Sequence, residues 1–303
     1  MRAAVLREVD GPFELVEVPD PVADGKLLVH VRAAGINFAD VLIRRGRYPQ
    51  MPELPAVLGS EIAGELDDGT RVMAMTSGGG GYAELAAVER TQVVPLPDGP
   101  TFAEGASFLL TFLTAYIPLT RQARLRPGAT VLVHAAAGGV GSAAIQCARA
   151  LGARVVAAVG SAEKLELCRG LGAEEAYVYD ELPDGLRADV ILDPVGGDLF
   201  AAALGRLRPL GTLVAIGFAA GLWPEMSPAN LVGRNAGVHG FYLGRLMRHE
   251  PEVVSEAIGE LLALWQLGAL RPVVGAELPL AEVEQAHELV ESRRSVGKVV
   301  LVP

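Results

Sequence analysis

The stretch that decides the fold runs Thr130-Val-Leu-Val-His-Ala-Ala-Ala-Gly-Gly-Val-Gly141 and continues Ser-Ala-Ala-Ile-Gln-Cys-Ala-Arg-Ala-Leu151. A β-branched run passes through small residues and glycines into a segment with helical spacing. This strand–turn–helix layout is typical of a dinucleotide-binding unit. The glycine turn, Ala136-x-Gly138-x-x-Gly141, has alanine at the usual first glycine and would leave backbone N–H groups facing a pyrophosphate at a helix N-terminus. An ordinary strand-to-helix turn is the alternative, and the flanking segments argue against it.

Downstream of this unit, strand-like and helix-like segments alternate. Helices are expected at residues 141–151, 162–171 and 198–207. Because such alternation brings successive strands together in parallel, it predicts a doubly wound α/β sheet of the Rossmann type. The expected strands are residues 131–135, 154–159, 176–178, 190–193 and 211–217.

The N-terminal part of the chain is β-rich by pattern. Residues 35–46 form a loop leading into a short helix, and three prolines between Tyr48 and Pro55 exclude regular structure there. Residues 102–123 have a helical period, with Pro118 as a kink. Strands are expected at 1–6, 13–18, 26–34, 57–66, 70–75, 82–88 and 298–302, and further helices at 251–267 and 281–292.

Length and composition limit the class of protein. At 303 residues the chain exceeds a typical single domain, so two domains are expected. The net charge of −10 argues against a nucleic-acid-binding surface. The sequence starts without the apolar region of a secretory signal, and no uninterrupted apolar run is long enough to span a membrane. We therefore expect a cytoplasmic protein without membrane or nucleic-acid partners.

The coenzyme is predicted from the end of the second Rossmann strand. An NAD-binding protein would place Asp or Glu there to bond the ribose hydroxyls. This chain has Gly160-Ser161-Ala162-Glu163-Lys164, so Ser161 and Lys164 offer a hydroxyl and a cation instead. Because both would bind a 2′-phosphate, NADPH is favoured over NADH. Lys164 as a solvated helix residue is the alternative, and Glu163 is expected to point outward.

Five motifs are distributed along the chain: Gly35-Ile-Asn-Phe-Ala-Asp40, Leu58-Gly-Ser-Glu-Ile-Ala-Gly64, His134-Ala-Ala-Ala-Gly-Gly-Val-Gly141, Asp193-Pro-Val-Gly196 and Ala286-His-Glu-Leu-Val-Glu-Ser-Arg293. Together they resemble the zinc-independent quinone oxidoreductases of the ζ-crystallin type, in the medium-chain dehydrogenase/reductase superfamily. The resemblance implies a GroES-like β-rich catalytic domain formed by residues 1–112 and 243–303. A Rossmann NADPH-binding domain, residues 113–242, is inserted between these segments.

The resemblance also implies site residues. It places Asn37 at the nicotinamide edge of the substrate cleft, and Tyr48 at a cleft tyrosine, whereas Leu42 replaces the family's second tyrosine. Asp40 is a candidate cleft residue, with a loop or helix-capping role as the alternative. No residue is assigned as a certain catalyst. The cofactor-binding residues implied with Asn37 are Thr114, Gly138, Gly139, Val140, Gly160, Ser161, Lys164, Tyr179, Val195, Phe218, Phe241, Tyr242, Leu243 and Arg293.

A metal site is not expected. Zinc-dependent members of the superfamily have a cysteine where this chain has Asn37, and Gly-His-Glu where it has Gly59-Ser60-Glu61. A catalytic zinc needs three ligands of the Cys, His or carboxylate type, and only Glu61 could serve. Among the histidines, His134 is expected to be a packed core residue and His287 a helix-surface residue.

Without a metal, the chemistry favoured is hydride transfer to an acceptor that delocalises the incoming charge itself. NADPH-dependent reduction of quinones is therefore the leading hypothesis. Reduction of α,β-unsaturated aldehydes or ketones is one alternative. A non-catalytic NADPH-binding protein, acting as a sensor or an RNA-binding crystallin, is another. The resemblance further implies a homodimer, formed through an edge strand near residues 237–242.

Overall fold

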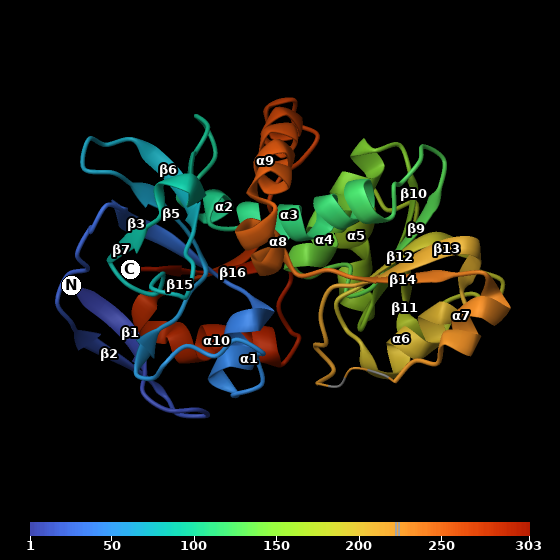
Figure 1. Ribbon diagram of the computed structural model, residues 1–303, viewed down its shortest axis with the longest axis horizontal. Helices are drawn as coiled ribbons and strands as arrows, with labels where there is room; N and C mark the ends of the chain where they lie inside the picture. The colour runs from blue at the N-terminus through green and yellow to red at the C-terminus, as the bar shows by residue number, and fades with distance from the viewer. Residues whose placement is uncertain (222, 224) are drawn as a thin grey trace. The chain divides into compact units, whose positions relative to one another are not determined.

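Two compact units make up the protein. The structure, a computed structural model, describes residues 1–221, 223 and 225–303 (Figure 1). Met1–Leu110 and Pro272–Pro303 form the first unit, and Thr111–Arg271 forms the second. The second unit extends past the predicted boundary at residue 242, because its C-terminal helices are bonded within it. Arg121 pairs with Glu260 at 2.9 Å, and the Gln146 amide donates to the Arg271 carbonyl at 2.9 Å.

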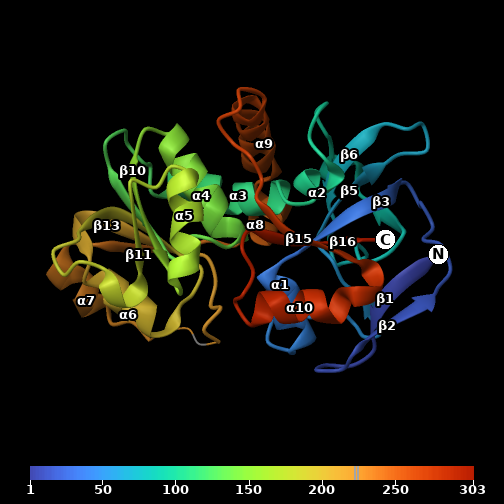
Figure 2. The same cartoon turned by 180° about the vertical axis from the view of Figure 1, so that it is seen from behind.

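The first unit is a β-rich domain with two sheets (Figure 2). Its seven-stranded sheet has the order β15-β16-β3-β5-β6-β8, with β7 pairing β3, and a three-stranded sheet has the order β2-β1-β4. Buried and exposed residues alternate along the middle of β3, from Val29 to Arg32, because one face packs on the core, and residues 33–36 are all buried. The strands are β1 (Arg2–Leu6), β2 (Phe13–Glu17), β3 (Leu27–Ile36), β4 (Ala56–Val57), β5 (Glu61–Glu65), β6 (Arg71–Met75), β7 (Leu85–Val88), β8 (Val93–Pro95), β15 (Val274–Pro279) and β16 (Lys298–Val302).

Three helices complete the first unit: α1 (Phe38–Arg44), α2 (Phe102–Gly105) and α10 (Val283–Glu291). One apolar cluster joins residues from β1, β3 and β5 to α10, so the C-terminal segment is part of the N-terminal core. This arrangement confirms the predicted GroES-like β domain with a returning C-terminal segment.

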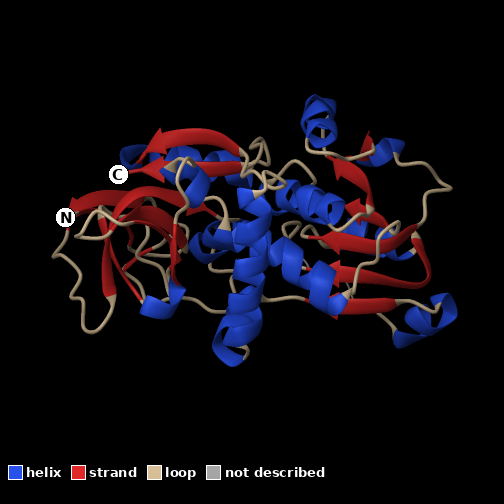
Figure 3. Ribbon diagram, turned by 90° about the horizontal axis from the view of Figure 1, so that it is seen from above, coloured by secondary structure: helices blue, strands red, loops and turns tan. Residues whose placement is uncertain are grey.

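The second unit is a six-stranded parallel sheet of order β11-β10-β9-β12-β13-β14. The β9 and β12 strands lie at the centre of the sheet, and the chain adds β10 and β11 on the side of β9 and β13 and β14 on the side of β12. Right-handed crossovers then place α4 and α5 on one face and α6 on the other, and Figure 3 shows helices on both sides of these strands. The strands are β9 (Thr130–Val133), β10 (Arg154–Val159), β11 (Glu175–Val178), β12 (Ala188–Asp193), β13 (Leu207–Ala215) and β14 (Gly237–Gly240). The predicted doubly wound Rossmann fold is confirmed.

The helices of this part of the chain differ in detail from the sequence prediction. The helical stretch 102–123 divides into α2, α3 (Leu109–Ile117) and a π-helical turn, Pro118–Gln122, which begins at the predicted kink. Leu207 begins a strand and does not end a helix, and α7 and α8 were not predicted. The remaining helices are α4 (Gly139–Ala150), α5 (Leu165–Gly170), α6 (Gly197–Leu204), α7 (Pro228–Arg234), α8 (Leu243–His249) and α9 (Pro251–Gln266).

One helical stretch, Phe102–Gln122, is long and apolar enough to cross a membrane by length and composition alone. Within its most apolar window, 83% of the residues are buried inside the protein. A core helix passes the same test, so this stretch is weak evidence for a membrane span.

Candidate functional site

The glycine turn joins β9 to α4 at the carboxyl edge of the parallel sheet. Ala135 has the left-handed φ of +47°, and its carbonyl accepts the Gly138 N–H at 2.9 Å. A Cβ at Gly141 would lie 2.2 Å from the Ala135 carbonyl oxygen and 2.6 Å from the Ala136 Cα. Glycine is therefore required at Gly141, because the helix packs directly on the turn. The first N–H groups of α4 have no partner within the helix, and they suit an anion such as pyrophosphate.

The end of β10 places the predicted coenzyme-selecting residues on one short segment. Gly160 is exposed, and a Cβ added there would meet no atom within 4 Å. Lys164 is half-buried, and burial lowers the pKa of its ammonium group. The Ser161 hydroxyl donates to the Glu163 carboxylate at 3.0 Å, so Glu163 lies against this segment. Glu163 is exposed, in keeping with the expectation that it points outward, and its carboxylate accepts this local hydrogen bond.

Side-chain contacts join the ends of β9 and β12, the two strands between which the strand order reverses. Open α/β sheets bind ligands at such a point. The His134 Nδ1 atom lies 3.3 Å from the buried Asp193 carboxylate, which also accepts the Val195 N–H at 2.9 Å. The Tyr179 hydroxyl accepts the Ala135 N–H at 2.8 Å and so supports the glycine turn. His134 is 2% exposed, as predicted for a core imidazole.

The other predicted site residues are divided between the two units. In the second unit, Thr114 is buried on α3, and the ring of Phe218 lies against that of Trp223, with centroids 4.9 Å apart and ring planes tilted by 41°. Phe241 and Leu243 are buried there, whereas Tyr242 is 41% exposed. In the first unit lie Asn37, Asp40, Tyr48 and the exposed Arg293, which has a left-handed φ of +59° just after α10.

A buried polar cluster in the first unit contains a residue that the sequence analysis missed. The Lys298 ammonium donates to the Asn37 Oδ1 atom at 2.7 Å and to the Glu61 carboxylate at 2.9 Å. The second carboxylate oxygen of Glu61 accepts the Leu110 N–H at 2.9 Å. Lys298 is 4% exposed and Glu61 is fully buried, and such charges are retained in a core only when paired in this way. A lysine that begins the apolar strand Val-Val-Leu-Val was the signal in the sequence.

Asp40 is fully buried beside this cluster. Its carboxylate accepts the Asn37 N–H at 2.8 Å, so it takes the helix-capping role that was the alternative for this residue. Burial raises the pKa of Asp40, although the bond from Asn37 and the Lys298 charge oppose that change. Burial also raises the pKa of Tyr82 well above its ordinary value, with the nearby Asp40 charge as the next cause.

His287 corrects a second expectation, because it is fully buried and was predicted on a helix surface. Its ring lies 4.7 Å from the ring of Phe13 and 5.7 Å from that of Tyr82. Neither ring nitrogen has a hydrogen-bond partner among the residues that the structure describes. Burial therefore lowers the pKa of His287 to about 3, and the charges of Arg44 and Arg45 act in the same direction.

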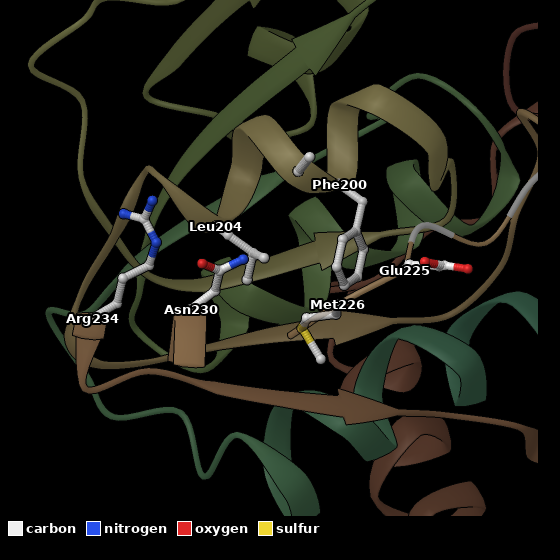
Figure 4. Close-up of a pocket in the computed structure, with 7 residues that line it drawn as sticks. Phe200, Leu204, Glu225, Met226, Asn230 and Arg234 are labelled. Atoms are coloured by element: carbon white, nitrogen blue, oxygen red, sulfur yellow. The ribbon is translucent and has the colours of Figure 1, made fainter. Parts of the chain in front are cut away.

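A separate hollow of about 120 Å³ lies between α6 and α7 in the second unit (Figure 4). Phe200 and Leu204 line it from α6, and Asn230 and Arg234 from α7. None of the predicted cofactor-binding residues lines this hollow.

Comparison with known proteins gives the family. The model of the GroES-like domain of alcohol dehydrogenases matches residues 23–98, and the model described as zinc-binding dehydrogenase matches residues 139–262. The quinone oxidoreductase of Pseudomonas aeruginosa is 36% identical, over 97% of this chain and 97% of its own length. The human synaptic vesicle membrane protein VAT-1 homolog is 34% identical, over 94% of this chain and 81% of its own length.

A solved structure matches over the full length. The quinone oxidoreductase of Thermus thermophilus, also solved in complex with NADPH, superposes with a TM-score of 0.91 at 43% identity and 100% coverage of both chains. The two-unit fold and the glycine turn thus define a dinucleotide-binding oxidoreductase of the medium-chain dehydrogenase/reductase superfamily. Within that superfamily, the chain belongs to the quinone oxidoreductase family.

The residues at the position of the superfamily's catalytic metal do not fit zinc. Asn37 and Ser60 stand where zinc-dependent members have a cysteine and a histidine. Glu61 is the third residue of the Gly59-Ser60-Glu61 motif, and its two carboxylate oxygens already accept hydrogen bonds from Lys298 and Leu110. Among the described residues, no group of three His, Cys, Asp or Glu side chains could hold a metal ion.

Proposed function

We propose that this protein uses NADPH to reduce quinones by hydride transfer, without a metal ion. The observation that carries the coenzyme assignment is the end of β10, where Ser161 and Lys164 stand and no acidic residue ends the strand. The Thermus thermophilus relative, solved with NADPH, supports it. The assignment of a quinone as the acceptor is supported by the relatives from Pseudomonas aeruginosa and Thermus thermophilus, which are named quinone oxidoreductases.

In this proposal, NADPH supplies the hydride, and the chain's own residues bind and orient the two reactants. The first N–H groups of α4, at Gly139 and Val140, bind the pyrophosphate. Lys164 and Ser161 bind the 2′-phosphate. Asn37 contacts the nicotinamide end of the cofactor. A quinone delocalises the charge that it accepts, so it needs no Lewis acid beside it.

The test of the function is NADPH oxidation with 9,10-phenanthrenequinone and 1,4-naphthoquinone, run beside α,β-unsaturated aldehydes and ketones. We expect turnover with the quinones, unchanged after treatment with a metal chelator. Turnover with the enones alone would replace the quinone assignment by the enone alternative. Tight NADPH binding without turnover of any acceptor would favour the alternative hypothesis of a non-catalytic NADPH-binding protein.

The coenzyme assignment predicts the effect of replacing Lys164 with alanine. Removing its ammonium group should weaken NADPH binding about 10- to 100-fold and leave NADH binding nearly unchanged, because only NADPH carries the 2′-phosphate. A charge-assisted hydrogen bond of about 1.5–3 kcal/mol has this effect. Fluorescence titration with both coenzymes measures the two dissociation constants.

A matched control lies one residue away. Replacing Glu163 with glutamine removes a negative charge from the same segment and keeps the side-chain oxygen that Ser161 bonds. NADPH binding should therefore become tighter while NADH binding stays constant. Equal losses for both coenzymes in Lys164→Ala would show that Lys164 has another role.

We also propose a homodimer that pairs β14 edge to edge. This strand ends the six-stranded sheet, and its residues His239 and Gly240 are exposed, as is the neighbouring Val232 on α7 at 76%. An unpaired edge strand is a pairing surface. Light scattering after gel filtration should give twice the mass of the chain, and His239→Pro should lower it.

A further inference from the structure

The strand register of the first unit brings three chemically distinct residues to one end of its sheet. On one side of β3, Val299 of β16 pairs with Ile36, which sets Lys298 opposite Asn37. On the other side, Ile62 of β5 pairs with Ala34, which sets Glu61 opposite Gly35. Side chains of directly opposed residues are neighbours on one face of a sheet. The fold therefore determines that this lysine and this glutamate meet beside Asn37.

Gly35 provides the space for the lysine. A Cβ at this position would lie 3.0 Å from the Lys298 Cε and 3.1 Å from its Nζ. It would also lie 2.1 Å from the Ala106 carbonyl oxygen. The Ala106 carbonyl therefore leaves no room for a side chain at residue 35, and the end of the Lys298 side chain packs closely against the glycine.

The ammonium group fixes which way the Asn37 amide faces. An ammonium only donates hydrogen bonds, so the atom 2.7 Å from Lys298 must be the amide oxygen. The Nδ2 group is then directed elsewhere, and its contact within the described residues is a long one, 3.4 Å to the Gly35 carbonyl. The main chain at Asn37 is held as well, because Asp40 accepts its N–H. The Nδ2–H group of Asn37 is therefore a hydrogen-bond donor with a fixed orientation.

We propose that Lys298 is a positioning residue for the reaction: held by Glu61, it fixes the Asn37 oxygen so that Nδ2–H donates to the carboxamide oxygen of the nicotinamide. This proposal rests on the proposed function, in which Asn37 contacts the nicotinamide end of NADPH. In this proposal the Lys298 cation, which donates to the Asn37 oxygen at 2.7 Å, acts through Asn37.

The test removes both buried charges together, since Lys298→Met alone leaves Glu61 without its cation and could unfold the protein. In Lys298→Met/Glu61→Gln, we expect NADPH to bind about 10-fold more weakly. Binding of 2′-phospho-ADP-ribose, which lacks nicotinamide, should be unchanged. The kcat/KM for the quinone should fall about 100-fold, the effect of a reactant misplaced by about 1 Å.

Three comparisons decide how the effect arises. The exposed pair Lys26 and Glu89, replaced as Lys26→Met/Glu89→Gln, should leave all three values unchanged. Asn37→Asp keeps an oxygen for Lys298 but removes the Nδ2 donor, and it should reproduce the weaker NADPH binding. Adding Asn37→Ala to the charge-free double variant should cause no further loss if Lys298 acts through Asn37.

The outcomes are distinct. Wild-type values for both NADPH binding and kcat/KM in the double variant overturn the proposal and leave the pair a purely structural one. A further loss from Asn37→Ala in that background also overturns it. If the wild-type chain binds NADPH but reduces no quinone, only the proposed function fails, and the two dissociation constants still test Lys298. Absence of NADPH binding by the wild type overturns both.

Discussion

Replacing Gly141 with alanine should abolish measurable nucleotide binding and destabilise the protein by about 3 kcal/mol, the upper range for forcing extra volume into a packed region. The added Cβ would lie 2.2 Å from the Ala135 carbonyl oxygen, and both that atom and the Ala136 Cα belong to the backbone. Neither can move without opening the turn between β9 and α4. Because the turn positions the first N–H groups of the helix, binding and stability should fall together.

The matched control is Gly170→Ala, at the exposed end of α5. No atom lies within 4 Å of a Cβ at this glycine, so the substitution meets no steric obstacle. It should leave binding unchanged and stabilise the protein by about 0.5–1 kcal/mol, because alanine loses less backbone entropy in a helix. Thermal unfolding and NADPH titration measure both variants. Tight NADPH binding by Gly141→Ala would contradict the assigned role of the turn.

Replacing His287 with leucine should remove much of the protein's sensitivity to acid. The pKa of His287 is about 3 in the folded protein against an ordinary 6.5, so between these values the unfolded chain binds a proton that the native protein does not. Stability from this residue is therefore complete above pH 6.5 and is lost as the pH falls, at about 1.4 kcal/mol per pH unit. At pH 5 the loss reaches about 2 kcal/mol, and it levels off near pH 3.

The measurement is the free energy of unfolding in urea between pH 5 and pH 8. At pH 8 the variant should equal or exceed the wild type by about 1 kcal/mol, because leucine removes two buried nitrogens without partners. Its advantage should then increase by about 2 kcal/mol at pH 5. The exposed His249, replaced by glutamine, is the control and should change neither value. An advantage that stays constant with pH would show that another group causes the acid sensitivity.

Much of the fold could be predicted from local sequence pattern. The turn from Ala136 to Gly141 identified the Rossmann unit, because the glycine spacing and the flanking segments are both typical of a strand–turn–helix unit. Pro118 correctly marked an interruption in a long apolar helix. Segments such as α7, which is exposed throughout most of its length, were missed because no apolar face gives them a periodic signal.

The candidate site was predictable only where its residues are close in sequence. Lys298 was missed because its partners, Asn37 and Glu61, are 261 and 237 residues away, and pairing at that distance depends on strand register. His287 was misplaced for a related reason. Its helix, α10, has an apolar face and a polar face. His287 is buried because Phe13 and Tyr82, which are distant in sequence, pack against its ring, and the helical pattern alone does not reveal those contacts.

The open space at Gly160 has a practical consequence for engineering the coenzyme preference. The glycine turn has no room for a side chain at Gly141, whereas the end of β10 accepts a side chain at Gly160 without any repacking. A carboxylate installed there would stand where dinucleotide-binding folds that select NAD hold their acidic residue. The site therefore has one rigid half, which binds what the two coenzymes share, and one adjustable half, which distinguishes them.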